Sequence, residues 1–206
     1  MMTRTRAGIV GLVAACVLAA GVGSAWARNI DLNGAALTRT YTPLRFIAGA
    51  NTVSCNVTLQ LSFHSASFHK TVGALLGHVY RMNVSSCSGG SATVLAETLP
   101  WHARYAAFLG ILPDIIAIKK SIVGMSLKLQ PSGSVACLAR STATNPWVEN
   151  LNVGAAGEIR TVTSEERNPI PLEGFLCEFA GEVAIGGTGT VTRTETGRAD
   201  INVLLI

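Results

Sequence analysis

Hydrophobic and polar residues alternate most regularly from Val53 to His64, in the stretch "VSCNVTLQLSFH". Apolar side chains occupy its odd positions and polar side chains its even positions. A period of two is typical of a β-strand that has one buried face and one face in water. The pattern therefore predicts a long strand whose odd-numbered residues belong to the core.

Shorter alternating stretches recur along the rest of the chain, at residues 97–108, 121–130, 175–185 and 189–206. The last of them is typical of a closing hairpin with its turn at "ETGRAD" (195–200). One stretch, "LPDIIAIKK" (112–120), could begin a helix, but its β-branched residues favour a strand at least as strongly. Together the stretches predict an all-β fold, an antiparallel β-sandwich or barrel-like fold of about 8–10 strands, with little helix outside the signal peptide.

The tripeptide Ser-Phe-His occurs twice, ending at His64 and at His69. On an uninterrupted strand the second copy is out of phase with the first, and Phe68 would face water. A bulge or bend near Ser65–Ala66 returns Phe68 to the core and leaves His69 outside. We predict such an irregularity there.

The first 27 residues are organised like a signal peptide. Arg4 and Arg6 precede an apolar run, and Ala25 and Ala27 match the small residues that signal peptidase reads. We expect cleavage to leave residues 28–206 as one secreted all-β domain, extracellular or in the cell envelope, without a membrane span. A lipid anchor at Cys16, which ends the lipobox-like "VAAC", is the minor alternative, and a two-lobed split near residues 131–146 is the alternative to a single domain.

The net charge of +4 does not predict nucleic-acid binding. Two of the positive charges, Arg4 and Arg6, lie in the signal peptide, and the basic residues of the remaining chain are scattered. Lys119 and Lys120 form the only adjacent basic pair there, so no basic stripe arises. Nucleic acid is therefore excluded as an expected partner.

Cys55, Cys87, Cys137 and Cys177 remain once Cys16 is set aside with the signal peptide. An even number of cysteines in an exported chain predicts two disulfides, for which three connectivities exist. We favour the sequential pairing, Cys55 with Cys87 and Cys137 with Cys177, because a turn near residue 71 folds the strand that returns through residue 87 back beside residue 55. The wide spacing of these cysteines does not match a zinc site.

Motifs for catalysis are missing from the sequence. No Gly-x-Ser-x-Gly pentapeptide occurs. Glu178 and Glu182 would lie about 13 Å apart on one strand face, beyond the roughly 5–10 Å of a glycosidase pair. "GGTGT" (186–190) lacks the lysine and the helix of a phosphate loop, and is better interpreted as a bulge or a close backbone approach. We predict no catalytic residue and no cofactor.

The four histidines, His64, His69, His78 and His102, do not suggest a metal site. His64 and His69 would be roughly 15 Å or more apart at strand spacing. A register that sets His64 across from His78 would turn Leu76, Tyr80 and Met82 to the polar face, which the hydrophobic pattern opposes. We therefore predict no metal ligands.

The stretch "LPWHARY" offers one candidate ligand surface, made of Trp101, His102, Arg104 and Tyr105. Exposed Trp and Arg are common in recognition surfaces. The alternation within the stretch favours a different interpretation, in which Trp101 and Tyr105 belong to the core while His102 and Arg104 simply face water.

Three segments together carry a resemblance to other proteins: "FHSASFHKTVGALLGHV", "CSGGSATVLAETLPWHARYAAFLGILP" and "PLEGFLCEFAGEVAIGGTGTVT". In these segments the chain resembles uncharacterised secreted β-rich proteins of soil actinobacteria, a group without an assigned activity. The resemblance implies export, and it transfers no functional residue.

The sequence thus predicts a secreted, disulfide-stabilised domain with a structural or binding role and no enzymatic activity. Its ligand and partners are not identified by any motif, although contacts with the cell envelope or with a second copy fit an exported β-domain. The alternative is a small extracellular hydrolase whose site is assembled from residues dispersed in the sequence. A cluster of His102 with a carboxylate and a serine would favour that alternative.

Overall fold

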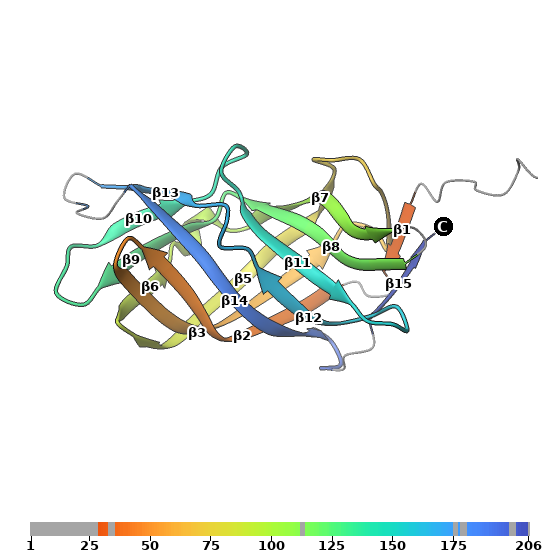
Figure 1. Ribbon diagram of the computed structural model, residues 1–206, viewed down its shortest axis with the longest axis horizontal. Coiled ribbons are helices and arrows are strands. Elements are labelled where there is room, and N and C mark those ends of the chain that lie inside the picture. Colours follow the sequence, from red (N-terminus) through yellow and green to blue (C-terminus); the bar gives the residue numbers. More distant parts are fainter. Residues whose placement is uncertain are drawn as a thin grey trace, which may run out of the picture.

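The computed structural model describes residues 29–32, 36–111, 114–174, 177, 181–197 and 201–205. Within these residues the protein is built from β-strands, with one 3-10 turn at Ala96–Thr98 and no α-helix (Figure 1). The strands are β1 Asn29–Leu32, β2 Ala36–Ala48, β3 Asn51–Phe63, β4 Ser67–His69, β5 Leu75–Ser88, β6 Gly90–Val94, β7 Trp101–Ile111, β8 Asp114–Val123, β9 Ser126–Pro131, β10 Cys137–Arg140, β11 Trp147–Val153, β12 Glu158–Ser164, β13 Ile170–Glu173, β14 Glu182–Arg193 and β15 Ile201–Leu205.

Eight of the strands form a closed antiparallel ring. Its order is β2-β3-β5-β7-β8-β11-β12-β14, and pairing of β14 with β2 and of β12 with β14 closes it. At the closure Thr161 of β12 lies opposite Thr190 of β14, which in turn lies opposite Thr40 of β2. The all-β prediction is confirmed, and the architecture is a barrel.

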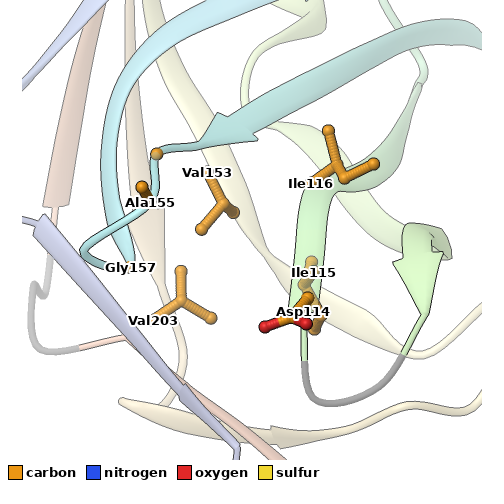
Figure 2. Close-up of a pocket in the computed structure, with 8 residues that line it drawn as sticks. Asp114, Ile115, Ile116, Val153, Ala155, Gly157 and Val203 are labelled. Atoms are coloured by element: carbon orange, nitrogen blue, oxygen red, sulfur yellow. The ribbon is translucent and has the colours of Figure 1, made fainter.

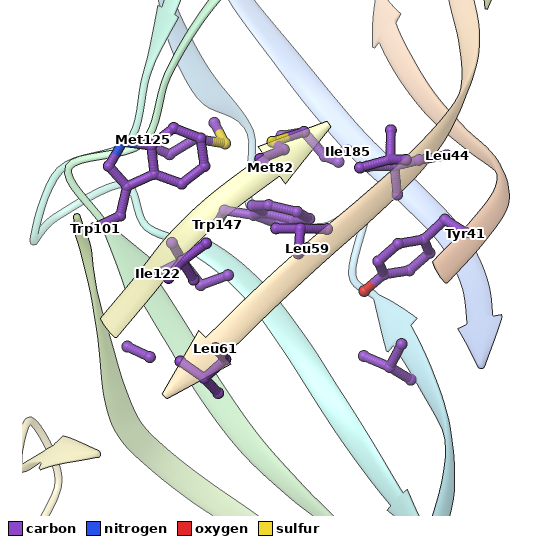
Figure 3. Close-up of a cluster of buried hydrophobic side chains, with 14 of the residues drawn as sticks. Tyr41, Leu44, Leu59, Leu61, Met82, Trp101, Ile122, Met125, Trp147 and Ile185 are labelled. Carbon is purple, nitrogen blue, oxygen red and sulfur yellow. The ribbon is translucent and has the colours of Figure 1, made fainter. Parts of the chain in front are cut away.

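Alternation along each strand places apolar side chains inside the barrel. On β3 the buried residues are Val53 and every second residue up to Phe63, as the period of two predicts. Large side chains from across the ring fill the interior, as Figure 3 shows: Tyr41, Leu44, Leu59, Leu61, Met82, Trp101, Ile122, Met125, Trp147 and Ile185. The outward positions of β3 carry polar residues: Ser54, Asn56, Thr58, Gln60 and Ser62.

The two ends of the barrel are closed differently. At one end β6, β9, β10 and β13 extend the sheet, and at the other end β1, β4 and β15 lie across the opening (Figure 1). Leu32 of β1, Phe68 of β4 and Ile201 of β15 belong to the same apolar core as the barrel interior. Those three short strands therefore cap the barrel.

The irregularity near Ser65–Ala66 is confirmed as a bend between β3 and β4. Beyond the bend, β4 leaves the ring and pairs with β1, with Phe68 opposite Ile30. Phe68 is buried there and His69 is exposed. The second Ser-Phe-His therefore belongs to a different strand from the first.

Glycines at 186 and 187 create a second irregularity, where the pairing of β14 with β2 shifts register before Gly189. A Cβ atom on Gly186 would lie 2.0 Å from Glu166 Oε1, so the carboxylate occupies the space that the missing side chain leaves. This confirms the interpretation of "GGTGT" as a bulge with a close approach. Glu166 forms a 2.8 Å ion pair with Arg45 beside an open polar groove of about 440 Å³.

The last strand pairs differently from the prediction. The predicted closing hairpin is wrong, because β15 pairs with β12 and β1 and not with β14. The stretch 112–120 contributes to a strand, β8, from Asp114 onward, while residues 112 and 113 lie outside the described part of the chain. Residues Ile170–Glu173 form the short strand β13.

Residues 131–146 do not divide the chain into two lobes. They include the end of β9, the turn to β10, β10 itself and the connection to β11, and strands from both sides of them belong to the same ring. β11 pairs with β8, for example, and β14 pairs with β2. The signal peptide predicted at 1–27 lies outside the described residues.

Two disulfides join Cys55 to Cys87 and Cys137 to Cys177, the sequential pairing favoured from the sequence. The first links β3 to the end of β5, and the second links β10 to the segment that follows β13. Disulfides persist in oxidising compartments, so the pair indicates an environment outside the cytoplasm.

Candidate functional site

An apolar cavity of about 420 Å³ opens at the capped end of the barrel (Figure 2). Its walls are the start of β8, the β11–β12 turn and β15, and its lining residues are Asp114, Ile115, Ile116, Val153, Gly154, Ala155, Gly157 and Val203. Branched aliphatic side chains provide most of the lining, and Asp114 is the one charged residue among them. Such a lining suits an aliphatic group better than a polar ligand.

The β11–β12 turn is held close to β15 by its backbone. Gly157 N donates to Gly154 O at 2.9 Å, and Val203 N donates to Gly157 O at 2.8 Å. Gly157 has a φ of 81°, a conformation that favours glycine. A Cβ on Gly154 would meet Glu158 Oε1 at 2.6 Å, so the Glu158 carboxylate lies against this glycine. The turn thus forms one wall of the cavity from backbone and small side chains.

The β7–β8 hairpin continues past the cavity and exposes large apolar side chains. Leu109 is 41% exposed, Ile116 64% and Ile111 83%. At Gly110, whose φ is 106°, the pairing shifts register, and a Cβ there would lie 2.4 Å from Asp114 O. The glycine therefore allows the two strands to pair to the very end of an apolar hairpin.

The continuous apolar run "YAAFLGILPDIIAI" is the sequence signal for this hairpin. The sequence predicts either a helix or a strand for residues 112–120, and neither prediction includes exposure, because a run of apolar residues usually indicates burial. Exposure arises here because β7 and β8 extend beyond the ring and no further strand covers their tip within the described residues.

The four residues of the predicted ligand surface do not lie on one surface. Trp101 and Tyr105 are buried in the barrel, with 0% and 3% exposed. Trp101 Nε1 donates to Thr98 Oγ1 at 2.9 Å, and Arg104 Nη1 donates to Gly73 O at 2.9 Å. The four residues therefore do not form a ligand surface: Trp101 and Tyr105 belong to the core, and His102 and Arg104 point outward.

His102 instead lies in a row of three histidines on the outer wall. His64 follows β3, His78 is on β5 and His102 is directly opposite His78 on β7. The ring centroids of His64 and His78 are 4.5 Å apart, and those of His78 and His102 are 5.0 Å apart. The pKa of His78 is lowered mainly by partial burial, and to a smaller extent by the neighbouring charges of His64 and His102.

The register that sets His64 across from His78 is not formed, as predicted, because His78 pairs with Ser62. A bulge in β5 nevertheless turns His78 to the outer wall. Gln60 pairs with Arg81 and Leu61 pairs with Val79, so Tyr80 is an extra residue between them. His78 then lies opposite Ser62 on the polar face, while Val79 and Met82 stay buried. An unbroken β5 would keep His64 and His78 on different faces, and the extra residue Tyr80 brings them to the same face.

A second polar cluster lies inside the barrel. The carboxylate of Glu149 on β11 pairs with Arg39 of β2 and Lys120 of β8, and Tyr41 Oη donates to its Oε1 at 2.5 Å. Arg39, Lys120 and Glu149 are each 0% exposed. Burial and the charge of Arg39 lower the pKa of Lys120 to about 7, although Glu149 opposes the shift. This cluster has no exposure to solvent and is part of the core.

The hydrolase alternative requires His102 to act with a serine and a carboxylate. In the described residues the aromatic ring against His102 is that of His78, and no hydrogen bond connects His102 to a serine or an acidic residue. The geometry around His102 thus gives no support to a catalytic triad.

Comparison with known proteins reveals no relative. No family model, curated protein or solved structure matches the chain. Among the described residues, no helical segment has the length and apolar character needed to cross a membrane. The function is therefore inferred from the site itself.

Proposed function

We propose that the protein is an exported, non-enzymatic binding protein that docks on a lipid surface of the cell envelope through the capped end of its barrel. The supporting observation is the exposure of Leu109, Ile111 and Ile116 around an aliphatic cavity. Large apolar side chains exposed together on one hairpin are typical of an interaction site. Each isoleucine moved fully out of water contributes roughly 1.5–3 kcal/mol, so a hairpin tip with two of them provides a useful part of a docking free energy.

A bilayer is the occupant that the rest of the chain favours. The apolar leader of the sequence directly precedes β1, and β1 pairs with the strand that carries Val203 of the cavity. Export through a membrane, or retention by a lipid on Cys16, would bring the chain to a bilayer from this end. Lys70 lies 5.8 Å from the ring centroid of Phe108 on the same hairpin, where its ammonium could remain in the headgroup layer while apolar groups enter the lipid.

The test compares vesicle binding of the native protein with that of the double variant Ile111→Ser/Ile116→Ser. The matched control is Val135→Ser, which removes a 44% exposed aliphatic side chain from the β9–β10 turn at the other end of the barrel. We expect the native protein and the control to sediment with vesicles of phosphatidylethanolamine and phosphatidylglycerol. The double variant should lose at least about tenfold in partition coefficient, since each factor of ten needs about 1.4 kcal/mol.

Failure of the native protein to bind these vesicles would contradict lipid docking. So would equal binding of the native protein and the double variant. Sedimentation velocity on the same samples detects the other occupant of an apolar surface, a second copy of the chain. If the native protein forms a dimer that the double variant does not form, and neither protein binds vesicles, the apolar surface is a self-association interface and not a lipid-docking surface.

A further inference from the structure

The row of His64, His78 and His102 has the spacing of imidazoles that share a metal ion. Imidazole nitrogen binds zinc at about 2.0–2.1 Å, which puts the ion about 3.2 Å from each ring centre. Two rings at bond angles of about 90° to 110° then have centres about 4.5–5.2 Å apart. The ring separations of 4.5 Å and 5.0 Å fall within this window.

The backbone holds the three histidines at this spacing. His78 and His102 are directly opposite each other in the pairing of β5 with β7. His64 N donates to Leu76 O at 3.0 Å, which fixes His64 beside the start of β5. The bulge at Tyr80 turns His78 to the outer wall, so all three imidazoles share one face. The sheet therefore fixes the backbone positions of the three histidines side by side on the outer wall.

The imidazoles are also chemically available. His64 and His102 are exposed and His78 is half-buried. The rings meet edge to face, at 88° and 63°, and within the described residues none of their nitrogens makes a hydrogen bond or an ion pair. Rotation of an exposed ring about χ2 can turn one of its nitrogens toward the neighbouring ring.

We propose that His78, together with His102 across the strand pair or His64 on its other side, binds one late divalent transition-metal ion on the outer wall of the barrel. Among the described residues no three His, Cys, Asp or Glu side chains converge on one point. The site therefore has two protein ligands at a time, with water in the other positions. Neutral imidazole selects zinc, nickel and copper, with copper bound most tightly, over magnesium and calcium, which need oxygen ligands.

The test is titration of the purified protein with Zn²⁺ and with Cu²⁺ by isothermal calorimetry, for the native chain and four single variants. We expect saturable binding of one ion per chain. His78→Ala, which removes the shared ligand, should weaken binding by at least about tenfold, because even disturbing a ligand's supporting contacts costs that much. His102→Ala and His64→Ala each leave one pair and should weaken binding less.

His69→Ala is the matched control, since His69 is an exposed histidine on β4 outside the row. It should bind metal like the native chain. A second readout is the shift of histidine ring resonances on adding Zn²⁺, expected for His64, His78 and His102 and not for His69. Near-UV circular dichroism shows that each variant is folded.

Three results would overturn the metal site. The first is no saturable binding of either ion at millimolar concentration. The second is native-like binding by folded His78→Ala. The third is an equal loss in His69→Ala, which would indicate adventitious binding by surface histidines. None of these outcomes bears on lipid docking, which involves a different part of the barrel.

Discussion

Inside the barrel, one carboxylate forms ion pairs with two buried cations. Glu149 faces both Arg39 and Lys120 and also accepts a hydrogen bond from Tyr41. Arg39 Nε and Nη2 have no protein partner in the described residues. Burial acts to raise the pKa of Glu149, but the charges of Arg39 and Lys120 outweigh it and keep the pKa below its usual value. The carboxylate is therefore ionised and its removal would leave two buried positive charges.

We expect Glu149→Gln to lower the free energy of unfolding by about 3–5 kcal/mol, the usual cost of breaking a buried ion pair from one side. The control is Glu166→Gln, which breaks the exposed pair with Arg45 and should cost about 1 kcal/mol or less. Urea unfolding followed by tryptophan fluorescence measures both. Equal losses in the two variants would mean that the buried cluster contributes little to stability.

Lys120 gives stability a distinctive dependence on pH. Its pKa is about 7 in the folded protein and close to 10.4 in an unfolded chain. Between these values the unfolded chain holds a proton that the folded protein lacks, so stability rises with pH, by up to about 1.4 kcal/mol per unit. Loss of that proton leaves Arg39 and Glu149 as a pair with no net charge.

The measurement is urea unfolding of native protein and of Lys120→Met from about pH 7 to about pH 9.5. The stability of the native protein relative to the variant should increase across this range. Parallel curves for the two proteins would show that Lys120 keeps its proton in the barrel.

At the scale of single elements, irregularities in the strands determine which side chains meet. The extra residue Tyr80 in β5 changes the phase of that strand and turns His78 outward. Gly77, next to His78, lies opposite Phe63, and a Cβ at this position would be 2.0 Å from Ser62 O. β3 and β5 approach so closely here that only glycine fits.

We expect Gly77→Ala to force β3 and β5 apart and to destabilise the protein by about 1–3 kcal/mol, the range for an overpacked core. Because the same approach positions His78, the variant should also weaken Zn²⁺ binding if the histidine row binds metal. Thermal unfolding and calorimetric titration measure the two effects. Native stability in this variant would show that the sheet can adjust without cost.

At the scale of the whole molecule, the ring joins both halves of the chain. β14 closes the barrel by pairing with β2, near the other end of the described sequence. The ion cluster likewise joins residues 110 positions apart, Arg39 and Glu149. Neither half therefore has a complete core of its own.

We expect the full chain to unfold in one cooperative transition, with equal calorimetric and van't Hoff enthalpies. A fragment that ends in the connection at 142–146 should remain unfolded, because it lacks β11, β12 and β14. Differential scanning calorimetry and circular dichroism test the two statements. Two separate transitions, or a folded fragment, would restore the two-lobed division that the ring excludes.

The sequence by itself determined the local features of this protein. Side-chain alternation defined β3 and its buried face, because a strand repeats every two residues whatever its partners are. The Cys55–Cys87 disulfide and the bend after His64 were also predictable, since the first joins two strands that follow each other around a turn and the second is one break in a short pattern. The Cys137–Cys177 disulfide then uses the two remaining cysteines. The apolar β7–β8 run was visible as well, but not its exposure.

Only the tertiary structure decided the pairing between distant strands. Strand register determines that β12 pairs with β14, that β15 pairs with β1 and that His78 lies opposite His102. One bulge changes which face every later residue of its strand occupies. The burial of Lys120 beside Glu149 was also decided by the pairing of distant strands. A charged residue in a sequence indicates a solvent-exposed position, and only the tertiary structure shows that it has a buried partner. The alternation of side chains determines which face of each strand is buried, and the closure of the barrel determines which strands are neighbours.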